Sequence, residues 1–172
     1  MWTVIFVFIS FFIYISYIYI VNCLFGTPKS LSESYYLFKE KREWMKNFFP
    51  LVILLMVSLL MPAWIEISKE SNFQFLAFLS AGSLLFTGTV PAFKSNKSED
   101  KIHTISAICS AVFSLMWVII VAKTWILLLI ITIAVLIDAI NEKALIKSKI
   151  YWLESIVFLS TFASIMYCLS IK

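Results

Sequence analysis

The sequence predicts an all-α protein, a polytopic transmembrane helix bundle with six spans and short loops. Three observations predict this class: 62% of the 172 residues are hydrophobic, only 14% are charged, and the apolar residues form long runs between charge clusters. A soluble domain has roughly 45–50% apolar and about 25% charged residues. This small number of charged residues supplies too little polar surface for a packed globule in water. We therefore expect a membrane protein.

Six apolar runs approach the length of about 20 residues that a helix needs to cross the bilayer core. They cover residues 2–25, 47–67, 72–93, 102–122, 124–140 and 150–171. The fifth run is the weakest span, because 17 residues at about 1.5 Å each barely cross a core of about 30 Å. The first run has no basic segment before it and no A-x-A-like cleavage site after it, so we expect it to be retained. Residues 1–172 therefore form a single transmembrane domain.

The basic residues predict the orientation of these spans. Eleven of the fourteen Lys and Arg residues follow the first, third and fifth runs: Lys29, Lys39, Lys41, Arg42, Lys46, Lys94, Lys97, Lys101, Lys143, Lys147 and Lys149. Basic residues near span ends stay in the cytoplasm, so both termini are expected outside. The net charge of +4 then lies on the cytoplasmic face, where it would meet anionic lipid head groups rather than nucleic acid.

The loop 26–46 is the only connection long enough for a structure of its own. Ser30 followed by Glu33 has capping-box spacing. Leu31, Tyr35, Phe38, Arg42 and Met45 recur at steps of three or four, with charged residues largely between them. This pattern predicts an amphipathic helix in the head-group plane that buries Leu31, Tyr35 and Phe38 in lipid. The alternative is a cytoplasmic extension of the second span, with Trp44 as an interfacial anchor.

Several short segments resemble small, uncharacterised six-span membrane proteins of gut bacteria and their tailed phages. They are residues 28–36 (PKSLSESYY), 62–66 (PAWIE), 75–78 (FLAF), 91–93 (PAF) and 100–103 (DKIH). The resemblance covers most of the chain. It implies a membrane location, with the bacterial inner membrane as the expected site, and it implies no catalytic activity.

The cytoplasmic ends of the later spans hold most of the polar candidates. Asp138 and Asn141 share one face of the fifth span, Glu154 lies four residues into the sixth, and His103 opens the fourth after Asp100. Ionisable residues within spans are functional candidates. In a compact bundle these groups and the loop serines Ser30, Ser32 and Ser34 would share one inner vestibule. The alternative is a solvated rim, in which acidic residues at helix N-termini complement the helix dipole.

The opposite face offers one carboxylate, Glu66, which is also explained as an interfacial group in water. Small residues recur at steps of four, as in Ala77 and Ala81, and in Ser160, Ser164 and Cys168. Such stripes predict close helix contacts. The stripe Ser106, Ser110 and Ser114, with Ala107 and Ala111 beside it, is interpreted in the same way.

Several chemistries are excluded by residue type. One histidine cannot supply a multi-histidine zinc site, and the three cysteines are too far apart in the sequence for a paired metal or redox motif. The three glycines cannot form a glycine-rich phosphate-binding loop. We therefore expect no metal and no cofactor. Three functions stay open. The first is a non-enzymatic membrane component with a membrane-protein partner or a second copy of itself. The others are a small transporter or channel using inner-face carboxylates, and a membrane-embedded enzyme acting on lipid head groups.

Overall fold

A computed structural model describes residues 2–90, 97–141 and 147–171. Within these ranges the protein is helical and contains no β-strand, which confirms the all-α part of the prediction. The elements are α1 (Trp2–Phe25), α2 (Ser34–Lys41), the 3₁₀ helix η1 (Glu43–Asn47), α3 (Phe48–Ser68), α4 (Phe75–Thr89), α5 (Lys97–Ile120), α6 (Trp125–Asn141) and α7 (Lys149–Ser170).

Each predicted span corresponds to one helix, but the helices differ in length. Among the described residues, four segments are long and apolar enough to cross a membrane: α1, η1 with α3, α5 and α7. Helix α4 has 15 residues and α6 has 17. Helix α4 is shorter than the predicted run because residues 71–74 form turns and because Val90, which precedes a proline in the sequence, leaves the helical region at φ −113° and ψ 57°.

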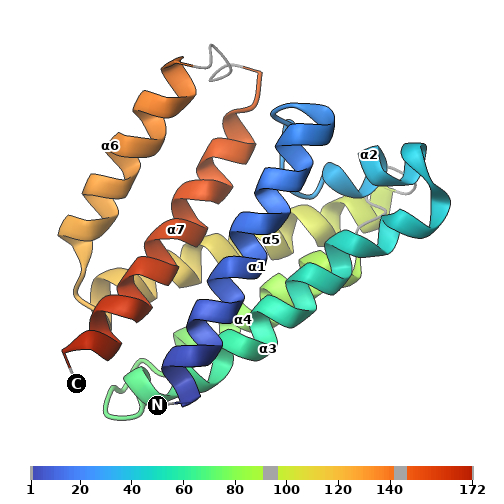
Figure 1. Ribbon diagram of the computed structural model, residues 1–172. Helices are drawn as coiled ribbons and strands as arrows, with labels where there is room; N and C mark the ends of the chain where they lie inside the picture. The colour runs from blue at the N-terminus through green and yellow to red at the C-terminus, as the bar shows by residue number, and fades with distance from the viewer. Residues whose placement is uncertain (1, 91–96, 142–146, 172) are drawn as a thin grey trace.

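The helices alternate in direction, so that the two termini lie at one end of the bundle (Figure 1). The other end, here called the basic end, contains the last turns of α1, α4 and α6, the first turns of α3, α5 and α7, and α2. Two bonds join the loop after α1 to the start of α7: Tyr151 N–H donates to Lys29 O at 3.0 Å, and Ser148 Oγ donates to Thr27 O at 3.3 Å. The described basic residues of this end are Lys29, Lys39, Lys41, Arg42, Lys46, Lys97, Lys101, Lys147 and Lys149.

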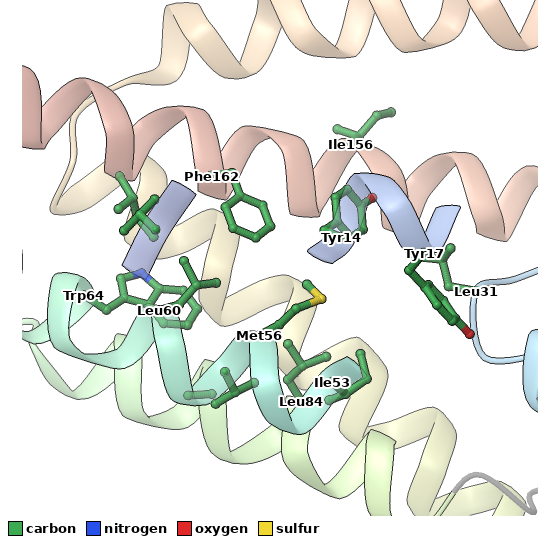
Figure 2. Packing of buried hydrophobic residues seen from close by; sticks show 14 of the residues in the cluster. Tyr14, Tyr17, Leu31, Ile53, Met56, Leu60, Trp64, Leu84, Ile156 and Phe162 are labelled. Atoms are coloured by element: carbon green, nitrogen blue, oxygen red, sulfur yellow. The ribbon is translucent and has the colours of Figure 1, made fainter. Parts of the chain in front are cut away.

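The core lies where α1, α3, α4 and α7 meet (Figure 2). Tyr14 of α1, Met56 of α3 and Phe162 of α7 are each 1% exposed, and the Tyr14 and Phe162 rings lie 5.7 Å apart. Helices α3 and α4 approach closely at Gly88, where an added Cβ would lie 2.9 Å from Cγ2 of Ile53. Large side chains from several helices therefore fill the centre of the bundle.

Hydroxyl groups connect the helices along two of the small-residue stripes, which confirms the predicted packing role of their serines. Ser80 of α4 donates to Ser110 O at 3.2 Å and also bonds the Ser114 hydroxyl of α5. On α7, Ser164 accepts from Thr124 Oγ1 at 2.6 Å and donates to Ser160 O at 2.7 Å. These hydroxyls form bonds inside the bundle instead of facing the apolar exterior.

The prediction that the loop after α1 forms an interfacial helix with its apolar face in lipid is wrong. Helix α2 covers only Ser34–Lys41, and Leu31, Tyr35 and Phe38 are buried in the protein instead of in lipid. The Phe38 ring, 1% exposed, contacts the rings of Tyr17, Phe25 and Phe48. The apolar face of the loop therefore has a protein partner, which the periodicity alone could not distinguish from lipid. Only η1, which contains the 59% exposed Trp44, directly precedes α3 as the alternative of an extended second span predicts, because the extended backbone of Arg42 separates α2 from it.

Candidate functional site

The described residues form a cleft of about 540 Å³ between α5 and α7 at the basic end. We call it the α5–α7 cleft. Helix α5 contributes one wall, α7 the other, and the loop between α1 and α2 closes the end. Its lining residues are Ser30, Ser32, Asp100, His103, Thr104, Ala107, Ile108, Ala111, Ile150, Leu153, Glu154 and Val157.

The polar lining residues lie together at one end of the cleft, beside the first turns of α5 and α7. Asp100, His103 and Thr104 belong to the first two turns of α5, and Glu154 belongs to the second turn of α7. Helix α5, described over Lys97–Ile120, includes five residues before the predicted span, and the acidic residues among them complement the helix dipole. This extension carries Asp100 and His103 along the α5 wall.

Glu154 joins α7 to the loop after α1. Its Oε2 accepts a hydrogen bond from the Leu31 backbone N–H at 2.6 Å. Leu31 is 5% exposed, so this N–H has little access to another acceptor. A second side-chain bond joins α7 to the end of α1, because Asn22 Nδ2 donates to the Tyr151 hydroxyl at 2.9 Å. The loop is therefore held in place as part of the cleft wall.

The loop also orders itself through its predicted capping residues. Ser30 Oγ accepts from Glu33 N–H at 3.2 Å, and Glu33 Oε2 accepts from Lys29 N–H at 2.8 Å. The second bond reaches one residue further back than in a standard capping box. The pair fixes the turn that presents the Ser30 and Ser32 hydroxyls, which bond each other at 3.1 Å.

His103 connects the α5 wall to the end of α4. The side chain is 5% exposed, and its Nδ1 lies 3.0 Å from Val90 O. With the proton on Nδ1, the imidazole donates to this carbonyl and Nε2 is the acceptor nitrogen. The histidine therefore has a structural role at the α4–α5 contact as well as a place on the cleft.

Only some of the residues predicted to share an inner vestibule lie together in the structure. His103, Asp100 and Glu154 line one cleft, whereas Asp138 and Asn141 are exposed on α6 and do not line it. Helix α6 turns Val135 and Ala139 into the bundle, whereas Asp138 and Asn141 stay exposed beside this inward face. The predicted gathering of all these groups in one place is thus wrong for the α6 residues. Glu66 is half-buried near the other end of α3.

The cleft continues inward as a narrower cavity of about 70 Å³. The two share five lining residues: Ser32, Ala107, Ala111, Glu154 and Val157. The inner cavity extends between α3, α4, α5 and α7 as far as Trp64, whose indole Nε1 has no hydrogen-bond partner among the described residues. Ser110, Ser114, Thr87 and Thr161 add hydroxyl groups to its wall.

Sequence reasoning missed the apolar part of the cleft. Ala107 and Ala111 were interpreted as packing residues, but their small side chains leave the hollow beside α5 open. A stripe of small residues predicts either a contact or a hollow, and only the positions of neighbouring helices decide which one forms.

Within the described ranges, no three His, Cys, Asp or Glu side chains gather closely enough to hold a metal ion. In comparisons with protein-family models, curated proteins and solved structures, nothing matches this chain. The function proposed below therefore rests on the chain's own surface and cleft.

Proposed function

We propose that the protein is a non-enzymatic integral membrane protein that crosses the bilayer with six helices and acts as a partner or modulator of other membrane components. Both termini lie outside, and the basic end faces the cytoplasm of a bacterial cell. The distribution of polar and apolar residues over the surface is the main support for the membrane placement. Large apolar side chains cover the outward faces of the long helices, while the basic residues gather at one end of the bundle.

Helices α1 and α6 present this apolar surface most fully. Phe8 and Phe12 of α1 are 56% and 72% exposed, and Ile130 and Ile133 of α6 are 57% and 51% exposed. In water such faces would promote aggregation, whereas lipid chains solvate them. Helix α6 turns only two residues of its described length fully inward, so lipid is its main neighbour in this proposal.

A non-catalytic role is supported by what the candidate acid–base groups already bind. One Glu154 oxygen accepts from Leu31, and His103 Nδ1 lies against the Val90 carbonyl. Both groups hold backbone segments together. These bonds give each group a structural role in the bundle that explains its position without a catalytic reaction.

Cysteine labelling in intact cells tests the placement and orientation. The native Cys23, Cys109 and Cys168 are replaced, and single cysteines are introduced at the N-terminus, at Ser98 or at Lys172. We expect an impermeant maleimide to label the two terminal positions in intact cells and Ser98→Cys only after permeabilisation. Labelling of Ser98→Cys alone in intact cells would contradict the orientation, and labelling of all three would contradict the six-span arrangement.

A second candidate function is transport of a small cation, and the inner cavity is the observation that favours it. This cavity extends from Glu154 past the middle of α3 to Trp64. Ion flux into proteoliposomes distinguishes the two functions. The non-enzymatic membrane component is expected to give the same flux as protein-free vesicles. A flux that Glu154→Gln abolishes and Asp138→Asn preserves would favour the transporter.

A further inference from the structure

We propose that the α5–α7 cleft binds one phospholipid of the cytoplasmic leaflet whose head group carries a primary ammonium, as in phosphatidylethanolamine. The inference rests on the proposed membrane placement and goes beyond it by assigning a site and a ligand class. Three features support it: the length of the cleft, its opening towards the exterior, and the arrangement of charge at its polar end.

The length of the cleft matches one leaflet. Its lining on α5 extends from Asp100 to Ala111, eleven residues along the helix. At about 1.5 Å per residue this is roughly 16 Å, and half of a hydrocarbon core of about 30 Å is roughly 15 Å. A lipid with its head group beside Asp100 would therefore have part of an acyl chain beside Ala107 and Ala111.

The cleft opens sideways, towards the surface that lipid covers in the proposed placement. Three of its apolar lining residues, Ile108, Ile150 and Leu153, are 57%, 51% and 61% exposed. A ligand could thus enter from the bilayer without first passing through water. A small polar metabolite would gain little from these side chains, whereas an acyl chain fits them.

Charge at the polar end favours a zwitterionic head group with an ammonium. Asp100 and Glu154 line the cleft and supply carboxylates. Three exposed lysines, Lys29, Lys101 and Lys149, are chain neighbours of lining residues on three separate segments. The carboxylates suit the ammonium, and the lysines around them suit the phosphate.

A primary ammonium suits this site better than a trimethylammonium because it donates hydrogen bonds. One Glu154 oxygen accepts from Leu31 N–H, and a carboxylate has about four acceptor positions over its two oxygens. Ser30 and Ser32 add hydroxyl oxygens at the same end. Phosphatidylcholine lacks the N–H donors, and phosphatidylglycerol lacks the positive charge.

The test measures which lipids stay with the full chain. The protein is reconstituted into nanodiscs from equal parts of phosphatidylethanolamine, phosphatidylcholine and phosphatidylglycerol with identical acyl chains. It is then transferred to detergent, and the retained lipid is counted by native mass spectrometry. One charge-assisted hydrogen bond corresponds to about a tenfold preference, so we expect phosphatidylethanolamine to be retained about tenfold over phosphatidylcholine. Equal retention of the three lipids, as for lipid at the bundle surface only, would overturn the proposal.

Matched variants locate the binding. The double variant Asp100→Asn with Glu154→Gln is expected to lose the preference, whereas Asp138→Asn, a carboxylate near the same end but outside the cleft, keeps it. Ala111→Leu fills the apolar part and is expected to reduce retention, while Ala134→Leu on α6 leaves it unchanged. An unaltered preference in the double variant, or an equal loss in Asp138→Asn, would overturn the assignment to this cleft.

Failure of this proposal is distinguishable from failure of the membrane placement. Cysteines at Ser98 and Lys172, labelled in a membrane of known sidedness, report the placement without reference to lipid type. Opposite sides together with equal lipid retention would overturn the lipid site alone. The same side for both cysteines would overturn the placement on which the site depends.

Discussion

Replacing Glu154 by alanine is expected to release the loop after α1 from α7. The substitution removes the acceptor of the Leu31 N–H, which lies 2.6 Å from Glu154 Oε2, and leaves this N–H in a residue that is 5% exposed. An unsatisfied buried donor costs about 1–3 kcal/mol, so the free energy of unfolding should fall by about that amount. Glu154→Gln keeps an oxygen acceptor and should cost about 1 kcal/mol, because it loses only the charge-assisted part of the bond.

Two measurements in detergent micelles test this expectation. Denaturant titration followed by tryptophan fluorescence gives the free energies, and hydrogen exchange reports the Leu31 amide, which should lose protection in Glu154→Ala and largely keep it in Glu154→Gln. Asp138→Ala is the control, since its exposed side chain should change stability by less than about 0.5 kcal/mol. Wild-type stability and wild-type protection at Leu31 in Glu154→Ala would refute the reasoning.

Three further substitutions test the packing through the midpoints of the same titrations. Phe38→Ala should cost about 3–5 kcal/mol because the ring is 1% exposed within the protein, whereas a lipid-facing ring would cost much less. Ser68→Ala should cost about 1–3 kcal/mol because it removes the acceptor, 2.7 Å away, of the buried Trp117 indole N–H, and Ser68→Thr should retain most of the bond. Gly88→Ala should be less stable than Gly82→Ala by about 1–3 kcal/mol, because only the Cβ at position 88 meets a close α3 neighbour; equal stabilities would contradict this contact.

Much of the helical architecture could be predicted from the sequence because apolar runs and charge clusters are local signals. Helix α1 has the predicted bounds, and α3, α6 and α7 are shifted by one residue. Helices α4 and α5 differ more, and for local reasons. The residue before a proline leaves the helical region after α4, and acidic residues stabilise an earlier start of α5.

The candidate site could be predicted only in part, because it depends on how the helices rotate and which of them meet. Placing Glu154 and His103 near the same end required only the alternation of spans, and both line the cleft. Asp138 satisfied the same rule but is exposed on α6 and does not line the cleft. A helix that is apolar on nearly every side gives no sequence signal for which face turns inward. For the same reason, the pattern around Phe38 indicated a buried face without showing that its partner is protein.

The central claim is that even the short helix α6 crosses the bilayer, and depth measurement along it is the most direct test. Ile126, Ile133 and Ile140 are 55%, 51% and 60% exposed and lie seven residues apart, so they share one face over about 21 Å. Nitroxide labels are placed at these positions in proteoliposomes, and their accessibility to oxygen and to a water-soluble nickel complex is compared. A spanning helix predicts the greatest depth at Ile133, with Ile126 and Ile140 nearer to opposite interfaces. Equal depth at all three positions would mean that α6 lies along the membrane surface, and would contradict the six-span account.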